Sequence, residues 1–298
     1  MIAPVQSGNS VGSGKGLQAF VVLTGIFVFV LLFFADKTQL KNPERGLETV
    51  NSEEQVRVDH PSSGGSSLES LVNSGSDSPE IKTLKSRLEV EKAEGKPQVL
   101  QEIVEKLRDE SKLDQAAVYA AKLADLVPEA KNCLVAGALF RTTSEGFHAD
   151  GDSVRFLAFS EKAIEYLKKA DVLKPNDEAI MIELGLTMVG SGIPENSMLG
   201  IQKLVKVLEI NPANEEAAYQ LGVFSLQTGQ YEKAESRFRK VIELNPKNLQ
   251  AKLLLGGALR ETGKVKEAKV IFEELAKQQR DTEIASMAAE MLSELKNK

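Results

Sequence analysis

Apolar and polar residues alternate with a helical period over most of the chain, and the stretch 215–248 shows this most clearly. It holds two runs in which apolar residues recur every three or four positions, the spacing of one helix face. The turn sequence Thr228-Gly229-Gln230 separates the runs, and Asn245-Pro246 ends the second because proline cannot continue a helix. The pattern predicts two antiparallel helices of about three turns each. Their inward residues are Ala218, Leu221, Gly222, Leu226, Ala234, Phe238, Val241, Ile242 and Leu244.

Six positions of this stretch resemble the tetratricopeptide repeat, a helix-turn-helix unit of about 34 residues. The matching residues are Leu221, Gly222, Tyr231, Ala234, Phe238 and Pro246. Two positions depart from the repeat: Ala218 stands where a large aromatic residue is expected, and Ser225 stands where a tyrosine is expected. One unit cannot bury its own apolar face, so neighbouring units are required.

Related units lie on both sides, because prolines and Leu-Gly pairs recur at similar intervals. The resemblance implies an all-α fold, a right-handed superhelical solenoid of about five helix pairs. The expected repeats are 97–130, 131–177, 178–214, 215–248 and 249–280. We expect a capping helix at 79–94 before them and a C-terminal capping helix at 282–296, so that the solenoid fills 79–298.

The residues before the solenoid have a different composition. Residues 1–15 are polar and rich in glycine and serine, and we expect them to be disordered. Gly16–Ala35 carries no charge and is long enough to cross a hydrocarbon core about 30 Å thick, so we predict a transmembrane helix. A cleaved signal peptide is the alternative, but Phe33-Phe34-Ala35 lacks the small residues that the peptidase needs. Residues 36–78 read as a flexible linker.

The orientation of this predicted anchor is weakly specified. Lysine and arginine residues flank the apolar segment on both sides, and a literal count favours a cytoplasmic solenoid slightly. The chain also resembles anchored bacterial repeat proteins, which implies a single-pass protein of the inner membrane with its repeats in the periplasm. We therefore expect an inner-membrane protein with its repeats in the periplasm.

The second repeat contains an insertion, Thr142 to Arg155, which we expect to form a loop. The side chains of Glu145, His148, Asp150 and Asp152 could together hold a divalent ion. Their spacing fits no known metal loop, however, and solvated polar loops often have this composition. We therefore predict no metal here.

Other chemistry is not indicated. The sequence contains no phosphate-binding loop, no paired metal ligands and no nucleophile motif, so we predict no catalytic residue, no cofactor and no enzyme activity. The single cysteine, Cys133, falls on the apolar side of a predicted helix and reads as a core residue. Acidic and basic residues are nearly balanced in the repeats, which excludes the basic face of a nucleic-acid-binding protein.

The resemblance places the first helix of each pair on the concave face. The lysine, asparagine and arginine residues by which co-chaperones of this family hold a carboxylate are largely missing there. The third to fifth repeats instead present an apolar strip with Glu216, Gln227 and Gln250 beside it, and such strips commonly bind proteins. The alternative is that the strip is core between repeats. The predicted partner-binding residues are Ile182, Leu186, Val189, Tyr219, Val223, Leu226 and Leu253.

These observations predict a non-enzymatic, membrane-anchored scaffold that binds an amphipathic helix or an extended peptide of a protein partner. By resemblance, the process is envelope protein assembly or secretion. One alternative is an accessory regulator of a membrane enzyme complex, such as that of cytochrome c maturation. Another is a self-assembling structural protein that forms homo-oligomers through the apolar strip.

Overall fold

The computed structural model describes residues 68–72, 75–278 and 282–296. The chain divides into two units, and all of the described residues belong to the second, His60–Lys298. Within these ranges the chain is helical and contains no strand, which confirms the predicted all-α class. The predictions made for residues 1–15 and 16–35, and for the linker 36–78 as far as residue 67, lie outside the described part of the chain. At the end of that predicted linker, Leu68–Leu71 forms a short 3-10 helix, and Leu71 and Val72 pack against the core.

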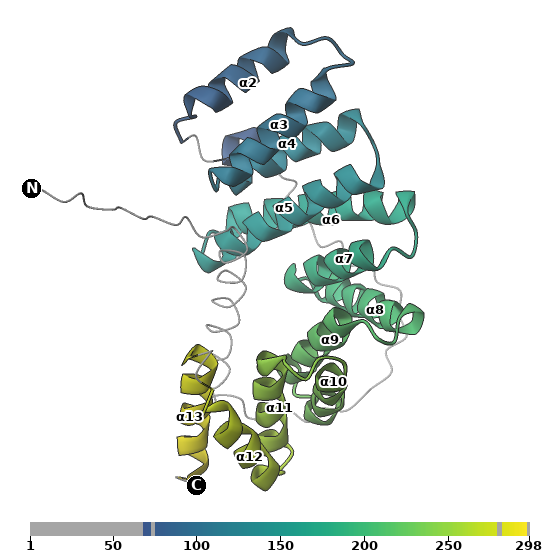
Figure 1. The fold of residues 1–298 in the computed structure, drawn as a ribbon. Helices are drawn as coiled ribbons and strands as arrows, with labels where there is room; N and C mark the ends of the chain where they lie inside the picture. The colour runs from purple at the N-terminus through teal and green to yellow at the C-terminus, as the bar shows by residue number, and fades with distance from the viewer. Residues whose placement is uncertain (1–67, 73–74, 279–281, 297–298) are drawn as a thin grey trace, which may run out of the picture. The chain divides into compact units, whose positions relative to one another are not determined.

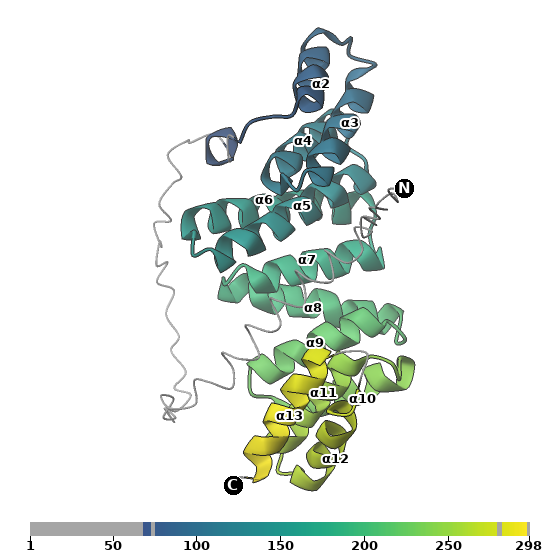
Figure 2. The same cartoon turned by 60° about the vertical axis from the view of Figure 1, so that its left-hand side comes forward.

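The helices follow one another as a series of hairpins, coloured from blue to yellow in Figure 1. Each helix packs mainly on the helices before and after it in sequence, an arrangement also visible in the turned view of Figure 2. In addition, α5 touches α7, α9 touches α11, and α11 touches α13. The elements are η1 (Leu68–Leu71), α2 (Pro79–Val90), α3 (Lys96–Asp109), α4 (Leu113–Leu126), α5 (Ala130–Ala149), α6 (Ser153–Leu173), α7 (Glu178–Gly190), α8 (Pro194–Ile210), α9 (Glu215–Gln227), α10 (Tyr231–Leu244), α11 (Leu249–Glu261), α12 (Val265–Leu275) and α13 (Thr282–Lys296).

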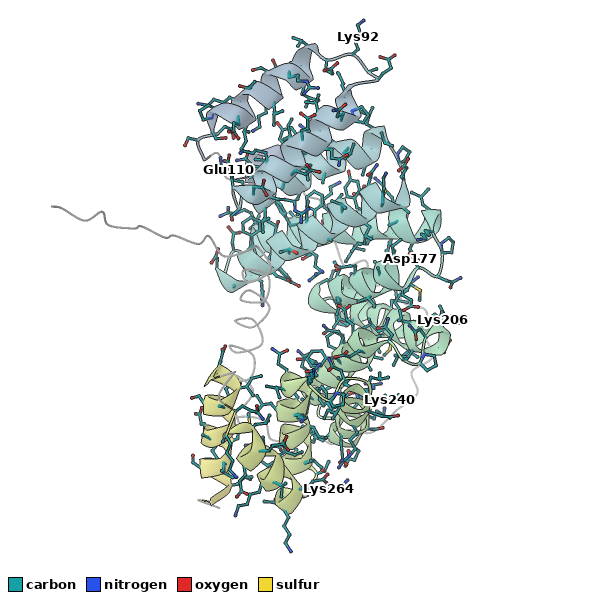
Figure 3. The ribbon with its side chains drawn as sticks, viewed as in Figure 1. Lys92, Glu110, Asp177, Lys206, Lys240 and Lys264 are labelled. Atoms are coloured by element: carbon teal, nitrogen blue, oxygen red, sulfur yellow. The ribbon has the colours of Figure 1, made fainter. Side chains whose placement is uncertain are left out.

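Asparagine and aspartate side chains start the first helix of successive hairpins. The Asn214 side chain accepts a hydrogen bond from Ala217 N at 2.9 Å, and Asn248 accepts one from Ala251 N at 2.8 Å. Asp177 does the same at the start of α7, where Figure 3 labels it. Each cap satisfies a backbone donor that has no partner inside its helix.

Glycine lets the two helices of a hairpin approach closely. A Cβ atom on Gly222 of α9 would lie 2.7 Å from Cε1 of Phe238 on α10. The corresponding pair in the next hairpin is Gly256 of α11 with Phe272 of α12. Both phenylalanines are fully buried, so each aromatic ring fills the space that the glycine leaves.

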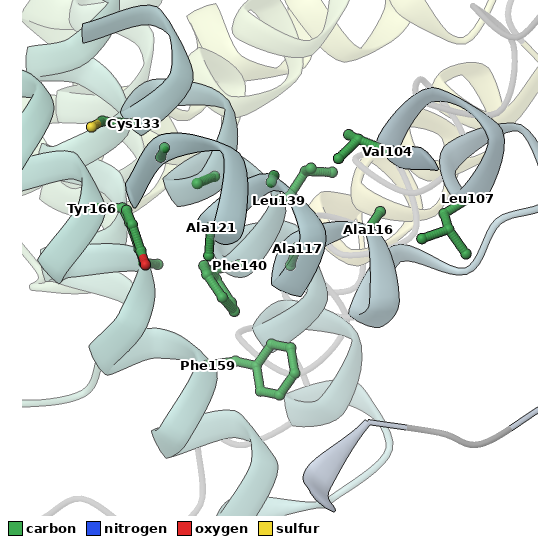
Figure 4. Packing of buried hydrophobic residues seen from close by; sticks show 14 of the residues in the cluster. Val104, Leu107, Ala116, Ala117, Ala121, Cys133, Leu139, Phe140, Phe159 and Tyr166 are labelled. Carbon is green, nitrogen blue, oxygen red and sulfur yellow. The ribbon is translucent and has the colours of Figure 1, made fainter. Parts of the chain in front are cut away.

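An aromatic cluster joins α5 to α6. The Phe140 ring meets that of Phe159 edge-on at 5.5 Å and stacks on that of Tyr166 at 5.8 Å (Figure 4). The ring of Phe147 also meets Phe159 edge-on, at 5.1 Å. Cys133 is buried beside this core, and desolvation raises the pKa of its thiol. This cysteine is therefore a small core residue, as its place in the sequence predicted.

The predicted loop at Thr142 to Arg155 is wrong, because most of that segment is helical. Helix α5 continues to Ala149 and α6 begins at Ser153, so only the residues between them form the turn. The extension is helical because Phe147 lies seven positions after Phe140 and is buried on the same side of α5. The guanidinium of Arg155 covers the outer face of the Phe147 ring at 4.6 Å.

The structure also corrects the predicted location in a membrane. No helix in the described ranges is both long enough and apolar enough to cross a bilayer. The two longest, α5 and α6, carry ionisable side chains along their length, and such groups are costly in hydrocarbon. The segment Gly16–Ala35, on which the prediction rested, lies outside the described residues.

Candidate functional site

The first helices of four successive hairpins, α5, α7, α9 and α11, carry the candidate site. We call their solvent-facing side the A-helix face. Helix α5 touches α7 and α9 touches α11, while side chains of α5, α7 and α9 interact with one another as described below. Residues distant in sequence therefore share this one surface.

The structure divides the seven predicted partner-binding residues into two groups. Ile182, Leu226 and Leu253 are buried, with 5%, 6% and 4% of their surface exposed. These three are core residues beneath the surface rather than contacts on it, and the burial of Leu226 agrees with its place among the inward residues of its helix. The other four are half-buried; they are Leu186, Val189, Tyr219 and Val223. Val189 packs toward α8, where a Cβ on Gly200 would lie 2.9 Å from its Cγ2 atom.

A guanidinium bridges α5 and α7 on this face. Arg141 Nε donates to Glu183 Oε2 at 2.7 Å, and Arg141 Nη1 donates to Glu145 Oε1 at 2.6 Å. Desolvation opposes the charge of Arg141, but the carboxylates of Glu145 and Glu183 outweigh it and raise the pKa of the guanidinium. Arg141 is therefore fully charged and held in place by two carboxylates.

Glu216 is the neighbouring carboxyl group on α9, in the first turn of that helix. It is exposed to solvent, yet desolvation by the atoms around it raises the pKa of its carboxyl group. The charge of Glu183 raises this pKa further, and Arg141 opposes the rise. In the described part of the chain, Glu216 has no ion-pair partner.

Tyr219 lies one helical turn after Glu216 and combines an apolar contact with an unpaired hydroxyl. Its ring meets that of Phe238 edge-on at 6.0 Å. Its hydroxyl oxygen is buried and has no hydrogen-bond partner among the described residues. Desolvation raises the pKa of the Tyr219 hydroxyl to about 12, so it is protonated at neutral pH.

The far end of the A-helix face is closed by the last helix. Arg260 of α11 donates to Glu294 of α13 at 2.8 Å and to Glu261 at 3.2 Å. Only 11% of the Arg260 side chain is exposed. The open part of the face therefore lies over α5, α7 and α9.

The four residues considered as metal ligands do not form a site. The described ranges contain no group of histidine, cysteine and carboxylate side chains that could hold a metal ion. His148 projects from α5 with its ring 4.9 Å from that of Phe156. Asp152 caps α6 by accepting from Arg155 N at 3.0 Å, and its bonds to Arg155 lower the pKa of its carboxyl group.

Paired helices, small residues where they cross and a proline after the second helix together define an all-α helical-repeat protein. The family comparison agrees with this class, since residues 226–291 match the family model described as "Tetratricopeptide repeat". That match runs from the end of α9 into α13. A search of the curated proteins gives no match.

Among solved structures, the chain is similar to MamA (residue 41 to the end) from Desulfovibrio magneticus RS-1, with 18% identity and a TM-score of 0.50. That match covers 63% of this chain and 97% of the other. A further MamA crystal structure gives 21% identity, coverage of 67% and 95%, and a TM-score of 0.48. YrrB, titled a TPR protein with an unusual peptide-binding site, gives 18% identity, coverage of 70% and 99%, and a TM-score of 0.47. At these identities the likeness extends to the fold alone.

Proposed function

We propose that this chain is a non-enzymatic scaffold that binds a segment of a protein partner on its A-helix face. The observation that carries the proposal is the row of half-buried apolar side chains on two adjacent hairpins, with carboxylates beside it. These side chains are Leu186, Tyr219 and Val223. An apolar centre with a polar rim is the usual composition of a protein-binding surface.

The partner's shape follows from the spacing of these residues. Tyr219 and Val223 lie four positions apart on α9 and therefore share one side of that helix. The contact residues on one side of a bound helix recur at the same spacing. An amphipathic helix or an extended peptide with recurring apolar residues would therefore cover them. Ile182, Leu226 and Leu253 have the supporting role of keeping α7, α9 and α11 rigid beneath the ligand.

The same substitution at two valines tests the proposal. Val223→Asp places a charge on the A-helix face, and we expect it to abolish partner recovery by the full chain while helix content stays unchanged. Val270→Asp on α12 is the control, because 63% of that side chain is already exposed. Recovery would be measured by affinity capture, folding by circular dichroism, and oligomeric state by light scattering.

The result separates the alternatives. A folded Val223→Asp variant that still recovers every partner would remove the A-helix face from consideration. If the full chain forms oligomers that Val223→Asp dissociates, the bound segment belongs to a second copy of this chain, which is the self-assembling alternative. If Val223→Asp unfolds the chain, this residue is core, and the face is not a binding surface.

A further inference from the structure

The charged side chains on the A-helix face are out of balance. Arg141 is the one cation in the group that it forms with Glu145, Glu183 and Glu216, so three carboxylates face one guanidinium. Both oxygens of Glu183 are already engaged by Arg141, at 2.7 and 3.4 Å. Arg141 forms no hydrogen bond or ion pair with Glu216.

The carboxylates that join one hairpin to the next are paired, and Glu216 is not among them. Glu178 accepts from two asparagine side chains, and so does Glu215. Glu235 is paired with Lys264 at 2.8 Å. The structure satisfies carboxylates that join its own repeats but leaves this one, on the candidate binding surface, without a cation.

The position of Glu216 at the N-terminus of α9 does not explain the direction in which the pKa of its carboxyl group is shifted. A carboxylate in the first turn is stabilised by the helix dipole, which lowers its pKa. The pKa of Glu216 is instead raised, first by desolvation and then by the charge of Glu183. The ionised form of Glu216 is therefore less favourable here than in a fully solvated glutamate, and a cation placed beside it would stabilise that form.

Apolar groups lie beside this carboxylate. Glu216, Tyr219 and Val223 are spaced by three and four positions, so they share one side of α9. Lysine and arginine carry a charge at the end of an apolar stem, and the stem can lie along an aromatic or aliphatic surface while the charge meets a carboxylate. The two parts of such a side chain match the two parts of this surface.

We propose that the protein segment bound on the A-helix face presents a lysine or arginine to Glu216 and Glu183, next to an apolar side chain that covers Tyr219 and Val223. This inference rests on the proposed function and names the chemistry of its partner. Here carboxylates on the protein would bind a basic ligand. In the co-chaperones of the tetratricopeptide family, basic residues on the protein bind a carboxylate of the ligand, and those basic residues are largely missing from this sequence. The ligand is a basic, partly apolar peptide segment.

Selection from a random peptide library tests the chemistry without knowledge of the natural partner. The full chain would be used to select twelve-residue peptides displayed on phage. We expect the bound peptides to be enriched in lysine or arginine beside apolar residues. Enrichment of acidic peptides, or of neutral ones alone, would overturn the inference.

The contribution of Glu216 would then be measured with a selected peptide by fluorescence anisotropy. Glu216→Gln should weaken binding about tenfold, the usual size for one charge pair at a partly desolvated surface. Replacing the peptide's basic residue with glutamine should weaken binding by the same factor and add nothing in the Glu216→Gln variant. Glu232→Gln, an exposed position on α10, is the matched control and should bind as the parent does.

The outcomes distinguish this inference from the function on which it rests. If peptides bind, Val223→Asp abolishes their binding, and Glu216→Gln has no effect, then the A-helix face binds peptides but recognises no cation there. If no peptide is selected, or if selected peptides are indifferent to Val223→Asp, both proposals fail. If Glu216→Gln and Glu232→Gln weaken peptide binding equally, the loss of affinity comes from the net charge of the chain. Glu216 would then not be a specific binding residue, and the inference would be wrong.

Discussion

Glycine has two opposite roles in these helices, and one substitution made at two positions separates them. A Cβ on Gly222 would lie 2.7 Å from the Phe238 ring, whereas a Cβ on Gly146 would meet nothing within 4 Å. We expect Gly222→Ala to destabilise the fold by about 1–3 kcal/mol through overpacking. Gly146→Ala in α5 should stabilise it by about 0.5–1 kcal/mol, because alanine loses less backbone entropy.

Urea midpoints of the two variants would test this pair. A Gly222→Ala variant as stable as the parent would show that α9 and α10 can separate without cost. A loss of stability in Gly146→Ala would mean that the α5 extension is not a regular helix.

The raised pKa of Glu216 makes stability depend on pH. The protonated carboxyl group is favoured in the folded chain, so its contribution is present below the unfolded pKa of about 4.3. That contribution is lost as the pH rises through the folded pKa, because the ionised group is disfavoured. We therefore expect Glu216→Gln to be more stable than the parent near neutral pH, with a difference that vanishes below about pH 4.

Thermal unfolding of parent and variant across this pH range measures the effect. A constant difference at every pH would show that the carboxyl group is not perturbed. Since the same variant is expected to bind peptide more weakly, a gain in stability would accompany the loss of function, as is common at binding sites.

At the scale of elements, successive hairpins are joined by one recurring clamp. The amides of Asn245 and Asn248, which follow α10, donate to Glu215 at the start of α9 at 3.0 and 2.9 Å. The same arrangement joins Asn211 and Asn214 to Glu178, at 3.0 and 2.7 Å. Each clamp links the first turn of one hairpin to the turn that begins the next.

Removing one clamp should weaken the stack measurably. We expect Glu215→Ala to lower the free energy of unfolding by about 1–2 kcal/mol, since two hydrogen bonds to a charged acceptor are lost. Glu243→Ala is the control, because its carboxylate forms only an exposed ion pair with Lys240 at 3.2 Å, worth little. Equal urea midpoints for the two variants would contradict a role for the clamp.

The helices were predictable from sequence where their chemistry is local. The residue types that mark the repeat recur at fixed spacing, and each packs within its own hairpin. In the hairpin of α9 and α10 they are Leu221, Gly222, Ala234 and Phe238. The extension of α5 was misread because Gly146 suggested a loop, while the evidence for helix was the packing of Phe147 against Phe159 on the other helix of the same hairpin. The burial of an apolar side chain is not evident from the spacing along its own helix when its partner lies on another helix.

The candidate site was predictable only in part, for the same reason. Tyr219 and Val223 were predicted as contacts on one side of one helix and are half-buried, whereas Leu226 was predicted as a contact and is buried. The grouping of Arg141 with Glu183 and Glu216 was missed, because these residues come from three different hairpins. No spacing rule within one repeat brings them together.

At the scale of the whole described unit, the last helix covers an apolar surface. Helix α13 packs on α11 and α12, and its side chains Ile284, Ala288 and Met291 are 4%, 0% and 6% exposed. A chain that ends at residue 278 would expose the partners of these side chains. We expect this chain to associate or precipitate, since solenoid ends require a covered apolar face.

Light scattering would compare the oligomeric state of a chain that ends at residue 278 with that of a chain that ends at residue 296 and keeps α13. Monodisperse behaviour and an unchanged melting temperature for the shorter chain would show that α13 is dispensable.

The aromatic cluster between α5 and α6 has a kinetic consequence. Phe140, Phe147 and Phe159 come from two helices that are adjacent in the chain, so they can meet after only a short loop has closed. This hairpin should therefore form early in refolding and then template its neighbours in both directions. Pulsed deuterium exchange would show this order, with the amides of α5 and α6 protected first and those of α2 and α13 last.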